Sequence, residues 1–207
     1  MSPAARDPYV YPGTNVLINN GDYRTQAELN QFEEDAVLLA FAAMKRRPIQ
    51  GPVDVRRLQE THRRIFAKVY PWAGEFRKDI GMLAENRSGF VVAYGPSQNI
   101  PGALEGVFAA LKAESDLRGL NTDAMAKRLA YYYGELDAIH AFREGNSRTL
   151  RAFTADLARE AGYTLDWSQI GSTDEARKRL YHARDLAVMR GDLSELTEIR
   201  RLCLTNQ

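Results

Sequence analysis

The 207-residue sequence predicts a mainly α-helical protein with one short β-hairpin. Apolar residues recur every three or four positions through most of the chain, which is typical of amphipathic helices. Proline, glycine or a capping residue bounds each of these stretches. Only the segment from about residue 75 to 100 combines several glycines with a β-prone run. That segment therefore predicts a hairpin, or flap, rather than another helix.

The composition predicts one compact domain over residues 1–207. The chain is 44% hydrophobic and 27% charged, which argues against wholesale disorder. Its 28 Lys and Arg nearly balance 27 Asp and Glu, so the net charge of +1 gives no overall attraction to nucleic acid. With one cysteine, no apolar run of about 18 to 20 residues and no signal-like amino end, we expect a cytoplasmic protein without a membrane anchor.

The first half of the chain is expected to hold an arm and two helices. Residues 1–24 contain prolines, glycines and paired asparagines, so they predict an irregular arm. A helix is predicted over residues 25–44, and the prolines of the following RRPIQGP segment end it. A second helix is expected to stop at Tyr70-Pro71. Its apolar face would carry Leu58, His62, Ile65, Phe66 and Val69.

The flap is predicted from a turn and the strand that follows it. Asn86-Arg87-Ser88-Gly89 has turn composition, and Phe90-Val91-Val92 directly after it is β-prone.

Helical periodicity returns after Pro101 and continues to the end. One helix is expected to begin at the cap Asn121-Thr122-Asp123 and to run to Ile139. Its buried stripe would be Met125, Leu129, Tyr132, Leu136 and Ile139. Further helices are predicted over 146–161, 173–190 and 193–204, the first of them ending at Gly162.

Other conspicuous residues favour structural roles. His62 is expected to be a satisfied core histidine, and Trp72 and Trp167 are expected to pack. The arginine pairs are expected to form solvated faces, with a basic groove as the minor alternative. These pairs are Arg56-Arg57, Arg63-Arg64 and Arg200-Arg201.

The segment that begins at His140 carries the chemistry, and it runs His-Ala-Phe-Arg-Glu-Gly-Asn-Ser-Arg-Thr-Leu-Arg. A helix ends at His140, a tight turn passes Gly145, and a new helix begins near Asn146. The free N–H groups and the dipole of that new helix form an anion site. Arg148 and Arg151 share one face near it, which suits a polyphosphate.

Glu144 would be repelled by a bound phosphate chain unless a divalent cation lay between them. Mg²⁺ binds nucleotides in this way, through one or two carboxylates and phosphate oxygens. His140 is a candidate general base, because histidine is the side chain that ordinarily exchanges a proton near neutral pH. Each residue alone has an ordinary alternative, since histidines pack at helix ends and Glu with two Arg forms solvated salt bridges. Ser147 and Thr149 lie at a helix start, where hydroxyls usually cap.

The pattern His-x-Phe-x-Glu-Gly-Asn-x-Arg-x-x-Arg resembles the signature of the Fic family, whose members attach AMP from ATP to protein hydroxyls. The segment from Tyr70 to Arg77 also resembles a family segment that leads into the flap. The resemblance extends over about residues 7–200. It implies a Fic-fold helical bundle with a β-hairpin flap beside the active-site loop.

The resemblance also implies roles for individual residues. His140 would be the general base toward a Tyr, Thr or Ser hydroxyl, Phe142 would anchor the loop, and Glu144 would hold Mg²⁺. Val91 and Val92 of the flap would dock the main chain of the target protein. The nucleotide-binding set would be Arg143, Gly145, Asn146, Ser147, Arg148 and Arg151.

Ser147 departs from the family pattern, because many members have glycine there. A side chain at this position could crowd the phosphates or restrict the backbone. In death-on-curing relatives, which transfer phosphate instead of AMP, this position is typically Lys, so the resemblance still favours AMP transfer. Two alternatives stay open: phosphate transfer of the death-on-curing kind, and a catalytically weak nucleotide-binding regulator in which Ser147 has blunted the site.

The resemblance also bears on regulation. Many Fic proteins carry an inhibitory Ser/Thr-x-x-x-Glu-Gly/Asn helix, whose Glu pairs with the second motif arginine. Glu85, Glu105 and Glu144 are followed by Gly or Asn, but none has a hydroxyl residue four positions earlier. The resemblance then suggests a toxin whose small antitoxin supplies the Glu to Arg151. DNA gyrase or topoisomerase IV subunits are the targets that it suggests.

Overall fold

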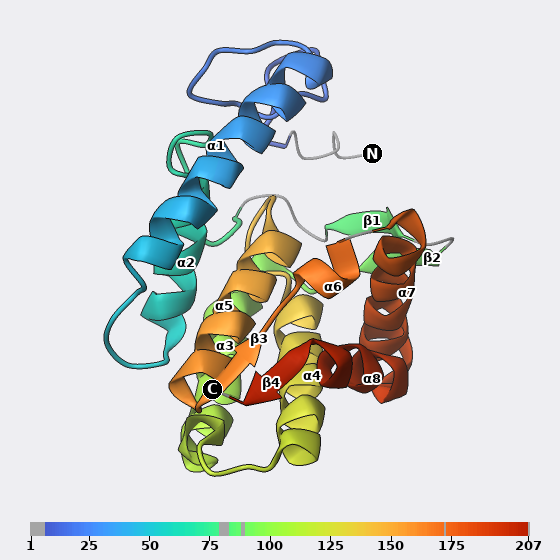
Figure 1. The fold of residues 1–207 in the computed structure, drawn as a ribbon. Coiled ribbons are helices and arrows are strands. Elements are labelled where there is room, and N and C mark those ends of the chain that lie inside the picture. The colour runs from blue at the N-terminus through green and yellow to red at the C-terminus, as the bar shows by residue number, and fades with distance from the viewer. Residues whose placement is uncertain (1–6, 79–82, 88–89, 172, 207) are drawn as a thin grey trace.

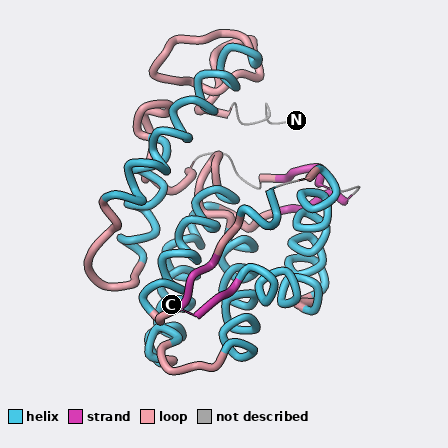
Figure 2. Tube along the Cα trace, in the orientation of Figure 1, coloured by secondary structure: helices cyan, strands magenta, loops and turns pink. Residues whose placement is uncertain are grey.

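Helices dominate the structure, a computed structural model that describes residues 7–78, 83–87, 90–171 and 173–206. The helix α4 (Thr122–Ile139) lies at the centre and packs against α3, α5, α7 and α8 (Figures 1 and 2). The helices α1 and α2 pack against each other at one end, and α2 also contacts α5. The remaining helices are α1 Gln26–Arg46, α2 Val55–Phe66, α3 Ile100–Ala113, α5 Asn146–Glu160, α6 Ser168–Gly171, α7 Asp174–Arg190 and α8 Ser194–Cys203. The mainly helical prediction is confirmed.

The helix α4 shows how local sequence sets the scaffold of the site. The Asn121 side chain accepts a 2.9 Å hydrogen bond from the Ala124 N–H, as a capping residue should. The expected stripe of α4 is buried through Leu136, and Tyr132 and Tyr133 lie in the core. The helix then ends at His140, whose backbone is left-handed.

The amino-terminal part follows the prediction with one difference. Residues 7–24 form an irregular arm with an isolated bridge between Val10 and Leu17. The helix α2 ends at Phe66, before Val69, although Val69 is buried as expected. The Phe66 carbonyl accepts hydrogen bonds from the N–H groups of both Val69 and Tyr70, so a turn replaces the last helical residues.

The predicted flap is a two-stranded antiparallel hairpin. Strand β1 (Ala84–Arg87) pairs with β2 (Phe90–Ala93), and Ala84 lies opposite Ala93. Ser88-Gly89 of the predicted turn and positions 79–82 of the flap lie outside the described residues. The side chains of β2 alternate, because Val91 is 71% exposed whereas Val92 is 2% exposed.

A second two-stranded sheet was not predicted. Strand β3 (Tyr163–Leu165) pairs with β4 (Leu204–Asn206), so the end of the chain lies against the segment after α5. Leu204 was expected to end a helix, but α8 stops at Cys203. Strands of three residues leave little periodicity for a sequence pattern to detect.

The prediction that the arginine pairs form solvated faces is wrong for Arg57 and Arg200. Arg57 is buried and donates to the carbonyls of Ile49 and Gly51, and it pairs with Asp156 and Glu160. Arg200 is also buried, with its guanidinium 4.2 Å from the ring centroids of Tyr133 and Trp167. Distant segments supply these partners, so the sequence pattern could not reveal them.

None of the helices in the described part of the chain combines the length and the apolar content that a bilayer crossing requires.

Candidate active site

The bend between α4 and α5 and the first turns of α5 carry the predicted site residues between His140 and Arg151, whereas Val91 and Val92 lie on β2. His140 caps α4 in a left-handed conformation (φ 48°, ψ 61°), and Gly145 precedes α5 with φ 81°. The Asn146 side chain forms two hydrogen bonds across the bend. Its Oδ1 accepts from the Phe142 N–H at 3.0 Å, and its Nδ2 donates to the Phe142 carbonyl at 2.8 Å. The backbone of the bend is therefore held by its own residues.

His62 packs against the bend and forms a hydrogen bond with its backbone. Its ring stacks on Phe142 with the centroids 3.9 Å apart. Its Nδ1 accepts from the Gly74 N–H at 2.8 Å, which makes Nε2 the donor to the Glu144 carbonyl at 3.0 Å. Burial lowers the pKa of His62 to about 4. His62 is thus the satisfied, neutral core histidine that was expected.

The lowered pKa of His62 predicts acid lability. In the unfolded chain His62 takes up a proton near pH 6.5, whereas in the folded chain it does so only near pH 4. Stability is therefore full above about pH 6.5 and declines as the pH falls toward 4, by up to about 3 kcal/mol. Urea unfolding across this window should show the decline. His62→Gln, which cannot titrate, should show a shallower slope, and equal slopes would contradict the assignment.

His140 is buried, with 4% of the residue exposed. It stacks on Tyr94, with the centroids 3.8 Å apart and the planes 18° apart. Its Nδ1 lies 4.0 Å from Oδ1 of Asp137. Arg184 holds that fully buried carboxylate with two bonds, of 3.0 and 2.7 Å. The Asp137 carboxylate, paired with Arg184, therefore lies beside one ring nitrogen of His140.

The first turn of α5 places backbone N–H groups near the guanidinium of Arg148. No side chain caps this turn, so its leading N–H groups have no partner within the helix. Arg148 pairs with Glu33 of α1 and lies 3.2 Å from Glu144, while Tyr70 donates a hydrogen bond to Glu33. Burial alone would lower the pKa of the Arg148 guanidinium. The two carboxylates outweigh burial, so the pKa of Arg148 is raised.

The other predicted nucleotide-binding residues lie around this turn. Arg143 makes an ion pair with Asp7 of the arm, at 2.7 Å, instead of pointing free into the site. Arg151 makes no ion pair with any described residue, and its Nε is buried. Its carbonyl accepts from the Trp167 indole at 3.0 Å. Ser147 is half-buried on the first turn.

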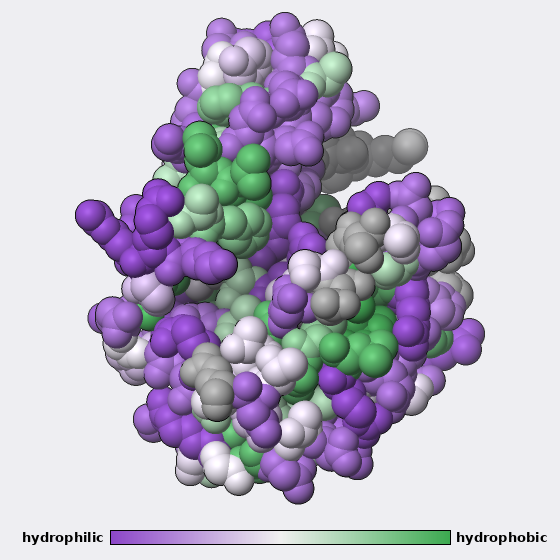
Figure 3. Space-filling view, viewed as in Figure 1, coloured by the Kyte–Doolittle hydropathy of each residue, from purple (hydrophilic) through white to green (hydrophobic). Residues whose placement is uncertain are grey.

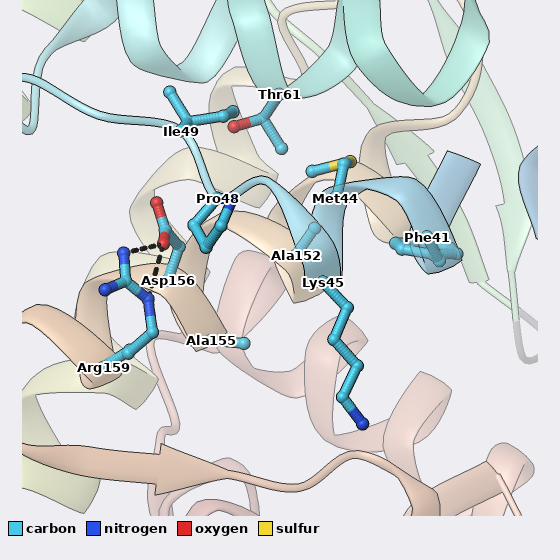
Figure 4. A pocket seen from close by; sticks show the side chains of 10 residues that line it. All are labelled: Phe41, Met44, Lys45, Pro48, Ile49, Thr61, Ala152, Ala155, Asp156 and Arg159. Atoms are coloured by element: carbon cyan, nitrogen blue, oxygen red, sulfur yellow. Dashed lines mark hydrogen bonds and ion pairs between the residues drawn. The ribbon is translucent and has the colours of Figure 1, made fainter. Parts of the chain in front are cut away.

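An apolar pocket of about 260 Å³ lies outside this site, between α1, α2 and α5. It is lined by Phe41, Met44, Lys45 and Ala155 among others (Figure 4). The neighbouring face of α1 exposes Leu38 and Leu39, where Figure 3 shows an apolar patch. None of the predicted site residues lines this pocket.

The sequence pattern missed several residues that shape the site. Glu33, Asp137 and Arg184 lie on three different helices, and no motif marks them. Arg77 had a signal, because it ends the segment that resembles the family's approach to the flap.

Comparison with known proteins shows the family of the chain. Residues 52–158 match the Fic/DOC family. The chain is 35% identical over 208 residues to "Protein adenylyltransferase VbhT" of Bartonella schoenbuchensis, covering 96% of this chain but 41% of that protein. It is 34% identical over 209 residues to "Probable protein adenylyltransferase y4lH" of Sinorhizobium fredii, covering 96% of this chain and 97% of that protein.

Solved structures share the fold over almost the whole chain. The BepC protein of Bartonella tribocorum, crystallised with AMPPNP, superposes with a TM-score of 0.87 at 23% identity, covering 98% of this chain and 99% of that one. The amino-terminal Fic domain of a Bartonella quintana effector, crystallised with ADP, has a TM-score of 0.86 at 25% identity, covering 96% and 95%.

Proposed function

This chain belongs to the Fic/DOC family, and from that premise we propose that it is a protein adenylyltransferase. It transfers AMP from ATP to a Tyr, Thr or Ser hydroxyl of a target protein. The relatives matched over most of this chain are named protein adenylyltransferases, and two related folds bind AMPPNP or ADP.

One observation in the structure carries the proposal. A single bend joins His140, which lies beside a buried carboxylate, to the start of α5, which no side chain caps. The side chain of Asn146 holds this bend by hydrogen bonds. The helix start and the guanidinium of Arg148 would bind the phosphates, and Arg151 would orient the γ-phosphate. Gly145 and Asn146 would line the phosphate-binding loop, beside Ser147.

The surroundings of Glu144 support a proposed magnesium ion at this bend. Glu144 uses Oε1 for the Gly145 N–H at 2.7 Å and for Arg148, whereas its Oε2 has no hydrogen bond to a described residue. The side chain is 40% exposed, and no group of three His, Cys, Asp or Glu within the described ranges could hold a metal. Glu144 would therefore bind Mg²⁺ together with phosphate oxygens and water. The ion would neutralise charge on the phosphates.

In the proposed reaction these residues act as follows. His140 accepts the proton of the target hydroxyl, and the hydroxyl oxygen bonds to the α-phosphorus. The bond from that phosphorus to the bridging oxygen breaks, and pyrophosphate leaves. Arg148 and the first turn of α5 stabilise the charge that develops on the phosphates.

The proposal includes partners for this site. The target main chain would add to the flap, where Val91 offers an exposed side chain and Val92 contributes through its backbone. We further propose a toxin role in the cytoplasm, with DNA gyrase or topoisomerase IV subunits as candidate targets. A small antitoxin would supply a glutamate to Arg151, which makes no ion pair with the residues that the structure describes.

Labelled ATP tests the reaction directly. The chain is incubated with bacterial lysate and ATP labelled on either the α- or the γ-phosphate. Label retained on protein only from the α-position supports AMP transfer. Retention only from the γ-position would instead show phosphate transfer, and no retention from either would favour the weak regulator that Ser147 suggests.

A further inference from the structure

Arg77 is a buried charge that the proposed reaction does not use. It follows the Tyr70–Phe76 segment, and it is 2% exposed. It makes no ion pair with a described residue, and burial lowers its pKa. A buried guanidinium without a carboxylate is costly, so its hydrogen bonds must compensate for the loss of water.

Those hydrogen bonds go to carbonyl oxygens on both sides of the site. The Nε of Arg77 donates to the His140 carbonyl at 2.7 Å, and its Nη2 donates to the Gly95 carbonyl at 2.7 Å. Its own backbone N–H donates to the Ala141 carbonyl at 2.9 Å. The carbonyls at the end of α4 carry the negative end of the helix dipole, which favours a cation here.

The carbonyls of His140 and Gly95 lie next to two stacked rings of the site. Gly95 directly follows Tyr94, and the Tyr94 ring stacks on the His140 imidazole. The Tyr94 N–H donates to the Leu83 carbonyl at 2.8 Å, beside the hairpin. One guanidinium therefore binds the backbone of His140 and that of Gly95, the residue next to Tyr94.

The backbone of His140 needs such a bond. A left-handed conformation costs a residue other than glycine about 1 to 2 kcal/mol. His140 has φ 48°, so relaxation toward the right-handed region would turn its carbonyl and move its ring off Tyr94. The Nε bond from Arg77 opposes this relaxation.

We propose that Arg77 is a positioning residue that couples the base of the flap to the general base. It holds His140 and Tyr94 in one geometry, so the imidazole and the hairpin that receives the target keep a fixed separation. This role rests on the proposed AMP transfer, although the coupling itself is a property of the fold.

Arg77→Lys tests the coupling, with Arg57→Lys as the matched control. Lysine keeps the charge but cannot bind two carbonyls in a fork. Arg57 is equally buried and also donates to two carbonyls, but it lies outside the site. We expect Arg77→Lys to lower kcat about 10- to 100-fold with little change in the KM for ATP, as misplaced catalytic groups do. Arg57→Lys should keep the wild-type kcat at a temperature where both variants are folded.

Hydrogen exchange gives a readout that does not depend on activity. Peptides containing the amides of Tyr94 and His140 should lose protection in Arg77→Lys but keep it in Arg57→Lys. If the wild-type chain transfers no AMP, the proposed function fails while the exchange result still decides the coupling. Wild-type kcat and protection in Arg77→Lys, or equal losses in Arg57→Lys, would overturn the inference.

Discussion

Replacing His140 with alanine is expected to lower AMP transfer by about 10²- to 10⁴-fold, the usual contribution of a general base. The imidazole is the proposed proton acceptor at the bend, and its Nδ1 lies 4.0 Å from Oδ1 of Asp137. Transfer is measured with ATP labelled on the α-phosphate. Binding of a non-hydrolysable ATP analogue should change little, because the helix start and the arginines stay in place.

The exposed histidine of α7 offers a matched control. His182→Ala removes an imidazole from a surface position outside the bend, and it should leave the transfer rate unchanged. Transfer by His140→Ala at the wild-type rate would remove His140 from the mechanism. Loss of analogue binding in that variant would show that its role is structural instead.

Gly145→Ala is expected to destabilise the fold by about 2 to 5 kcal/mol and to impair nucleotide binding. Two causes add at this position. Gly145 has φ 81°, which an L side chain rarely adopts, and an added Cβ would lie 2.3 Å from Cε2 of the Phe66 ring. That ring is fully buried and cannot move aside cheaply. Urea unfolding measures the loss.

Gly162→Ala separates the two causes. Gly162 has φ 89°, but a Cβ there would meet nothing within 4 Å, so only the backbone cost of about 1 to 2 kcal/mol should appear. The additional loss in Gly145→Ala then measures the clash. A second replacement, Phe66→Leu, should recover part of it. Equal losses in Gly145→Ala and Gly162→Ala would show that Phe66 does not enforce glycine.

Features that depend on neighbouring residues could be predicted from the sequence. The cap at Asn121, the end of α4 at His140 and the turn at Gly145 each follow from a few adjacent residues. The hairpin followed from the run at β2 and the turn composition before it. The roles assigned to residues of the bend by resemblance stay predictions, and the labelled-ATP experiments address them.

Pairings between distant segments could not be predicted. Asp137 binds Arg184 47 positions away, and Glu33 meets Arg148 across 115 positions. Hydrophobic periodicity indicates which face of a helix is buried, but not which charged residue of another helix meets it. Arg57 shows the same limit, because its partners Asp156 and Glu160 lie on α5.

The closure of the bend by Asn146 has a thermodynamic consequence for ligand binding. A loop that is already tied to one of its own amide side chains has little conformational entropy left to lose. Association with a nucleotide should therefore carry a heat-capacity change close to that of the buried ligand surface alone, without an added contribution from loop folding. Isothermal titration calorimetry at several temperatures measures this heat-capacity change, and we expect the value for binding to a preformed loop.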